Sequence, residues 1–152
     1  MPQERFKALS DDEMNADQQR VAKTLRESPR KGLPGPFHAL LRSPDLADRV
    51  RQVGDYIRYG NSLSDAQREL VILMAARYWS AQYEWHAHRR ISQAAGLDPA
   101  IPDAIAVGQR PAKMSADEAL IYDFCRELLY VRDVSDGVYE AALARFGERT
   151  VL

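Results

Sequence analysis

Four ionisable side chains suited to acid–base catalysis lie close together in the sequence: Glu69, Glu84, His86 and His88. A carboxylate inside an apolar helix is costly unless it is paired or protonated. Two carboxylates and an imidazole in one apolar pocket have coupled protonation states, so the group can take a proton from carbon and return it elsewhere. We interpret these residues as the candidate catalytic site.

The spacing separates a pair from an outlier. Glu84 and His88 are four residues apart, so on a helix they lie about 40° apart on one face and can touch. His86 points about 200° away from Glu84, off that face. Simpler interpretations stay open: an ordinary helix-surface pair, and for His86 a surface or interface histidine. A divalent cation held by one imidazole and two carboxylates is a further alternative.

Two helices between Ser64 and Gly96 must position these side chains. Ser64 and Gln67 form a capping box that begins the first helix, and Gly96 suits the residue just past the end of the second. The run at 70–76 is apolar on all sides, which is typical of a buried helix. We therefore expect the helix over 64–78 to be the most buried one, with a turn near 79–81 that folds Glu69 back onto the Glu84–His88 pair.

The remaining segments also show helical patterns without strand-like alternation, and they predict an all-α fold. Further helices are expected near residues 11–28, 36–41, 44–59, 99–107, 115–129 and 135–146. The first has sparse apolar positions, which predicts a surface location or a place on a neighbouring subunit. The Pro/Gly-rich segment 29–36 is interpreted as an ordered crossing loop. We expect residues 1–35 to hold the N-terminal helix and this loop, and residues 36–152 to form the main helical domain.

Composition excludes several classes of function. The 152 residues carry 21 basic and 22 acidic side chains, so nothing indicates a nucleic-acid or anionic membrane partner. The single cysteine, Cys125, cannot form an intrachain disulfide, which fits the cytoplasm. The N-terminal residues lack the apolar core of a signal peptide, and the 70–76 run is too short to cross a bilayer.

The stretch RELVILMAARYWSAQYEWHAHRRISQAAGL resembles the carboxymuconolactone decarboxylase and alkyl hydroperoxidase D superfamily. The peroxidase branch of that superfamily has a glutamate, then a Cys-x-x-Cys pair, then a histidine. In that motif the first cysteine follows the glutamate by twelve residues, and the histidine follows the second cysteine by four. In this chain the glutamate is Glu69, the cysteine positions hold Ala81 and Glu84, and the histidine is His88. The resemblance implies an alkyl hydroperoxidase D-like helical bundle. Family members that lack the cysteines usually continue into a further apolar helix, so this chain looks short at its C-terminus.

The missing thiols argue against peroxidase chemistry, which needs a thiolate nucleophile and a resolving thiol. The decarboxylase branch needs neither thiol, cofactor nor metal. The resemblance therefore implies a cofactor-independent lyase or isomerase that acts on a small carboxylated or lactone substrate. Glu69, Glu84, His88 and His86 would be its catalytic residues. Candidate substrate-binding residues are Arg77, Arg89, Tyr83 and Trp85.

One alternative class stays open: a catalytically silent helical oligomer that binds a ligand or partner in the same pocket. For either class we expect a homo-oligomer, because the aromatic residues near 78–85 need more cover than one small subunit offers. The resemblance favours a trimer or a hexamer. No nucleic-acid or membrane partner is expected.

Overall fold

The structure is a computed structural model that describes residues 6–28, 32–33 and 35–152. Within this part of the chain every regular element is a helix and no strand occurs, so the predicted all-α fold is confirmed. The chain divides into two compact units, residues 1–60 and 61–152. The division that we expected at residue 35 rests on sequence character and stays a prediction.

In the described residues, the first unit contains three α-helices, α1 (Ala16–Glu27), α2 (Phe37–Leu40) and α3 (Pro44–Tyr59), after the short 3-10 helix η1 (Asp11–Glu13). Helix α3 contacts both α1 and α2. Their small core consists of Met14, Val21, Ala22, Leu25, Phe37, Leu41 and Ala47. The crossing loop predicted at 29–36 lies partly outside the described residues.

The expectation for the first helix needs one correction. The predicted helix at 11–28 is interrupted, because Met14 is extended and Asn15 begins α1 with its own capping box to Gln18. Helix α1 has mostly exposed residues, as expected for a surface helix, and it buries Val21 and Leu25 in the core of the first unit. Few apolar positions suffice here because they all fall on one face.

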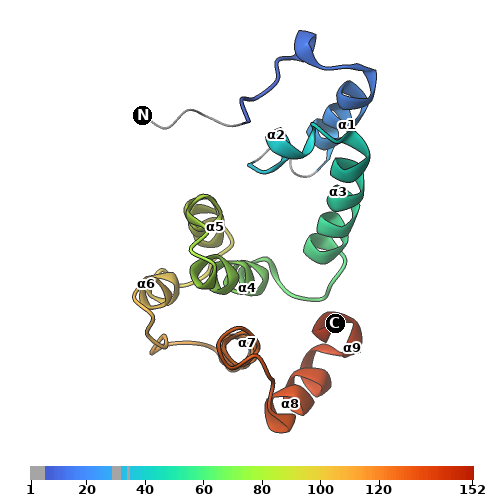
Figure 1. The fold of residues 1–152 in the computed structure, drawn as a ribbon. Helices are drawn as coiled ribbons and strands as arrows, with labels where there is room; N and C mark the ends of the chain where they lie inside the picture. The colour runs from blue at the N-terminus through green and yellow to red at the C-terminus, as the bar shows by residue number, and fades with distance from the viewer. Residues whose placement is uncertain (1–5, 29–31, 34) are drawn as a thin grey trace. The chain divides into compact units, whose positions relative to one another are not determined.

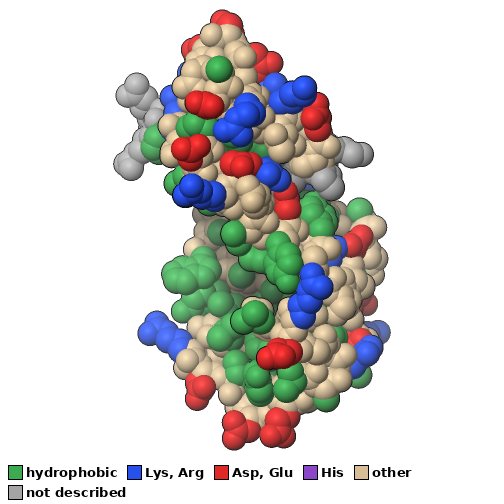
Figure 2. Space-filling view, turned by 90° about the vertical axis from the view of Figure 1, so that its right-hand side faces the viewer, with side chains coloured by type: hydrophobic (Ala, Val, Ile, Leu, Met, Phe, Trp, Pro, Cys, Tyr) green, Lys and Arg blue, Asp and Glu red, His purple; other side chains and the backbone are tan. Residues whose placement is uncertain are grey.

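Helix α3 begins at Pro44 and is terminated by Gly60, as predicted. Its apolar repeat, Leu46, Val50, Val53 and Ile57, is exposed. Figure 2 shows one face of the molecule, on which hydrophobic side chains lie exposed among charged ones. A sequence repeat predicts an apolar face, but it does not say what covers that face.

The second unit is built around α4 (Asp65–Tyr78), which contacts α5 (Gln82–Ala94), α6 (Ala100–Ala106) and α7 (Ala116–Arg126) (Figure 1). Helix α4 has more buried residues than any other described helix, as predicted: Glu69, Leu70, Leu73, Met74 and Ala76. The core of this unit also contains Leu97, Ile101, Ile105, Ile121, Tyr122 and Cys125. The capping boxes expected at Ser64 and Ser115 are both present.

The C-terminal part differs from the prediction in one place. Helix α7 continues as a π-helical turn, η2 (Glu127–Val131), and ends at Arg132 in a left-handed conformation. Helix α8 (Asp136–Phe146) and the short α9 (Glu148–Val151) follow. None of the helices in the described part of the chain has the length and hydropathy to cross a membrane.

Candidate acid–base site

A tight turn between α4 and α5 brings the candidate residues together. Residues 79–81 form the turn, as the sequence predicted, and the amide of Ala81 donates to the carbonyl of Ala76 at 2.9 Å. Helix α5 then runs back along α4, so that Glu69 on the first helix faces His88 on the second. Two residues that are nineteen positions apart in the chain are thereby in contact.

His88 bridges two carboxylates through its two ring nitrogens. Its Nδ1 lies 2.6 Å from Oε2 of Glu69, and its Nε2 lies 3.3 Å from Oε2 of Glu84. The side chains of Glu69 and His88 are only 3% and 9% exposed, whereas that of Glu84 is 39% exposed. The result is a line of three groups that runs from a buried carboxylate to one in contact with solvent.

The positions of these groups give each a different environment. Glu84 lies in the first turn of α5, where the helix dipole interacts favourably with a negative charge. Glu69 lies in the middle of α4 among buried apolar residues, and His88 is its polar partner across the helix pair. A hydrogen bond between an ionised carboxylate and an imidazole is about twice as strong as one between neutral groups. This bond fixes the ring and directs Nε2 toward Glu84.

The same geometry does not form a chelating site. Glu69 and Glu84 bind opposite nitrogens of the ring, so the three groups do not converge on one point between them. Among the described residues no group of three or more His, Cys, Asp or Glu side chains is arranged to hold a metal ion.

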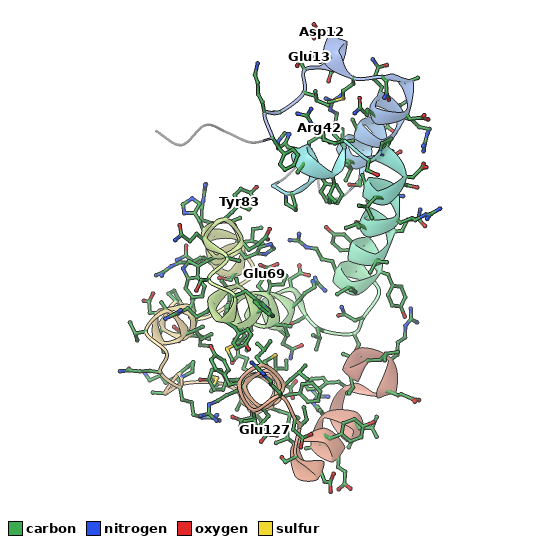
Figure 3. The ribbon with its side chains drawn as sticks, viewed as in Figure 1. Asp12, Glu13, Arg42, Glu69, Tyr83 and Glu127 are labelled. Atoms are coloured by element: carbon green, nitrogen blue, oxygen red, sulfur yellow. The ribbon has the colours of Figure 1, made fainter. Side chains whose placement is uncertain are left out.

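Other candidates from the sequence are not brought into this line. His86 is exposed, consistent with its helical phase. Tyr83 is also exposed and lies away from Glu69 (Figure 3). Trp85 is half-buried and packs against the core of the second unit.

The two arginines proposed for substrate binding have partners on or near α6. The Nε of Arg77 donates to the carbonyl of Ala106 at 2.9 Å, and Arg89 forms an ion pair with Asp103. Neither partner could be identified from sequence spacing, because α6 is brought alongside only by the tertiary fold.

Cys125 has the properties of a structural thiol. It is buried in the core of the second unit, and burial raises its pKa to about 12. A thiol with this pKa is almost fully protonated at neutral pH and is a poor nucleophile.

Two features near the site were not anticipated. Ser92 lies one turn beyond His88 on the same face of α5; it is fully buried, and its hydroxyl donates to the carbonyl of Arg89 at 2.9 Å. The four-residue spacing of Glu84, His88 and Ser92 could have indicated it. Ser80 has a positive φ of 52° in the α4–α5 turn, a conformation that serine does not signal in a sequence.

Comparison with protein families agrees with the helical fold. The model of the carboxymuconolactone decarboxylase family matches residues 44–120, just over half of the chain. The chain belongs to this family. The matched segment contains α3 through α6 and therefore all of Glu69, Glu84 and His88. Comparisons with curated proteins and with solved structures gave no match.

Proposed function

We propose that this member of the carboxymuconolactone decarboxylase family is a cofactor-independent acid–base enzyme that acts on a small carboxylated or lactone substrate by decarboxylation or isomerisation. The observation that carries the proposal is the line Glu69–His88–Glu84, with its buried inner end and its solvent-accessible outer end. A structural ion pair would not need a second carboxylate on the other ring nitrogen.

The line provides a means of moving one proton. With Glu69 ionised and accepting from the Nδ1–H of His88, one further proton is shared between Nε2 of His88 and the carboxylate of Glu84. Glu84 is the exposed member, so it is the group that would contact a substrate. His88 would hold the proton when Glu84 acts as base and return it when Glu84 acts as acid.

This proton balances the proposed reaction. In decarboxylation, the bond from carbon to the leaving CO₂ breaks and its electron pair stays on carbon, delocalised into an adjacent carbonyl as an enolate. The Glu84–His88 pair then supplies the proton that this carbon takes up. In isomerisation, Glu84 removes a proton from one carbon, and the pair delivers it to another.

The alternative is a silent oligomer that binds a ligand or partner in the same pocket. One observation favours it: Arg77 and Arg89, which were expected to hold a substrate carboxylate, bind Ala106 and Asp103. An enzyme of the proposed kind would need another cation or a rearrangement of these contacts.

The test is a screen of small carboxylated lactones and keto acids. It monitors CO₂ release, solvent-deuterium incorporation into substrate and thermal shift. We expect turnover that falls by about 10²–10⁴-fold in Glu84→Gln and His88→Ala. His86→Ala removes the same type of side chain from the same helix outside the line, so it should retain full activity. Thermal shift without turnover would favour the alternative, and turnover that survives His88→Ala would overturn the proposed proton path.

A further inference from the structure

The most conspicuous feature that the proposed function does not use is the exposed face of α3. Leu46, Val50, Val53 and Ile57 are 40–64% exposed. They occur at spacings of four, three and four residues, which is the repeat of a coiled-coil seam. We call these four residues the α3 seam. The core-facing residue of α3 is Ala47, which lies on a different face.

A shallow, mostly open depression of about 330 Å³ lies at the middle of the α3 seam and is lined by Arg49, Val50, Val53 and Gly54. Gly54 has no side chain to fill it, and the β-branched valines are short. A helix face with this shape accepts side chains from another helix in the manner of knobs entering holes.

The order of residues along the seam indicates which helix fits. The spacing reads the same in both directions, so an antiparallel copy of α3 would place Leu46 opposite Ile57 and Val50 opposite Val53. A two-fold axis requires such reciprocity, because residue i of one subunit contacts residue j of the other, and j contacts i.

The residues beside the seam are also self-complementary in this arrangement. Arg49 and Tyr56 lie along the same edge of the seam, one heptad apart. In an antiparallel pair, this edge of one helix meets the same edge of the other. Arg49 then lies next to Tyr56 of the second copy, twice by symmetry, as a cation–π pair. The opposite edge carries Gly54, which allows close approach of the backbones.

We propose that the α3 seam is a two-fold interface on which a second copy of this chain packs its own α3 in the antiparallel direction. A helix of sixteen residues is about 24 Å long and 10 Å wide. This footprint is small beside the ~800 Å² per partner of a standard interface. The seam alone therefore gives a weak dimer, with a dissociation constant on the order of micromolar.

The first experiment measures mass by analytical ultracentrifugation over a series of protein concentrations. Val53→Lys places a charge in the centre of the seam and should weaken the two-fold association about thirtyfold or more. The matched control is Val107→Lys, the same change at an exposed valine after α6. It should leave the association constant unchanged.

The second experiment tests direction and register with single cysteines under oxidising conditions. Chains with Leu46→Cys and chains with Ile57→Cys should form a disulfide-linked dimer only when mixed, while buried Cys125 provides the background. Disulfide dimers within the Leu46→Cys sample alone would indicate parallel pairing and overturn the proposal.

Two other outcomes would also overturn it. Equal effects of Val53→Lys and Val107→Lys on the mass would remove the seam from the interface. The other outcome combines two results: the protein is monomeric at every concentration, and Val53→Lys lowers the unfolding midpoint independently of concentration. Together they would show that another part of the same chain covers the seam.

Discussion

At the scale of single residues, the interpretation depends on His88 being held from both sides. Its Nδ1 has a buried hydrogen-bond partner and its Nε2 lies 3.3 Å from a half-exposed carboxylate, so the ring separates a buried carboxylate from a solvent-accessible one. In the proposed mechanism Glu69 would be a positioning residue, because the side chain of Glu84 is 39% exposed and that of Glu69 only 3%.

The first prediction concerns the stability of Glu69 variants. Glu69→Ala leaves the buried Nδ1 of His88 without this acceptor, which should lower the free energy of unfolding by about 1–3 kcal/mol. Glu69→Gln keeps an oxygen acceptor of the same reach and should cost less than about 1 kcal/mol. Urea unfolding followed by circular dichroism measures both.

The matched control uses the exposed Glu140 on α8. Its changes to alanine and glutamine should both stay within about 0.5 kcal/mol of the parent. If Glu69→Ala proves as mild as Glu140→Ala, the 2.6 Å contact of Glu69 with His88 does not contribute to folding, and its role in positioning the ring would have to be given up.

The second prediction concerns Cys125, whose pKa burial raises from 9.0 to about 12. Between these values the unfolded chain loses the thiol proton while the folded chain keeps it. The unfolded state then binds fewer protons, so the free energy of unfolding falls as pH rises through this window, by up to about 1.4 kcal/mol per pH unit. Below pH 9 this contribution is fully present.

Cys125→Ala isolates the effect. Tyr122, whose pKa burial also raises, contributes in the same direction in both proteins. The parent should therefore lose stability more steeply than the variant between pH 9 and pH 11. At neutral pH the folded parent should react with iodoacetamide only as fast as it unfolds. Rapid labelling of the native protein would contradict the inert character of this thiol.

Sequence predicted some of these residue assignments and failed on others for a physical reason. The pair Glu84–His88 follows from helical spacing alone, and the exposure of His86 follows from its phase. The contact of Glu69 with His88 needed the family resemblance and an assumed turn. The partners of Arg77 and Arg89 come from α6, and no local pattern encodes them.

At the scale of elements, the sequence predicted helices best where side-chain caps mark their ends. Ser64 and Ser115 accept hydrogen bonds from the backbone as expected. The prediction failed at Asn15, where a second cap follows the first within five residues, and at η2, where no glycine or proline marks the change of helical pitch. The left-handed conformations of Ser80 and Arg132 could not be predicted from the sequence, because glycine is the residue that usually adopts a positive φ.

The third prediction tests the turn that sets α5 against α4. A left-handed conformation costs an L-residue about 1–2 kcal/mol, and glycine avoids this cost. Part of the gain is lost, because glycine also raises the conformational entropy of the unfolded chain. Ser80→Gly should therefore stabilise the protein by about 0.5–1 kcal/mol, and β-branched Ser80→Val should destabilise it by about 1–2 kcal/mol.

Thermal unfolding provides the measurement for these turn variants. Ser135→Gly makes the same chemical change at a residue with a φ of −60° and should destabilise slightly, opposite in sign to Ser80→Gly. Equal signs for the two glycine variants would show that the Ser80 conformation carries no strain.

At the scale of the whole molecule, the two units have different cores. In its described residues the first unit buries seven apolar side chains among three helices, whereas the second unit is organised around a central helix that also carries Glu69. A domain of about 60 residues is only marginally stable by itself. The family match begins at the first residue of α3 and so includes part of each unit.

The last prediction is that the two units respond separately to loss of core packing. Leu25 and Leu73 are both fully buried, one in each unit. Changing either to alanine should cost about 2–5 kcal/mol. In the first unit this is enough to open α1 and α3 while α4 and α5 remain folded, because the two units have separate cores. The site should persist, because no residue of the Glu69–His88–Glu84 line comes from the first unit.

Hydrogen exchange of the native protein, read by mass spectrometry, follows both units at once. In Leu25→Ala, amides of residues 16–27 should lose protection while those of residues 65–94 keep it, and the activity of the site should persist. Leu73→Ala should expose residues 65–94 and abolish activity, because α4 carries both Leu73 and Glu69. If protection is lost together in both segments of Leu25→Ala, the chain unfolds as one cooperative body, and the site depends on the first unit after all.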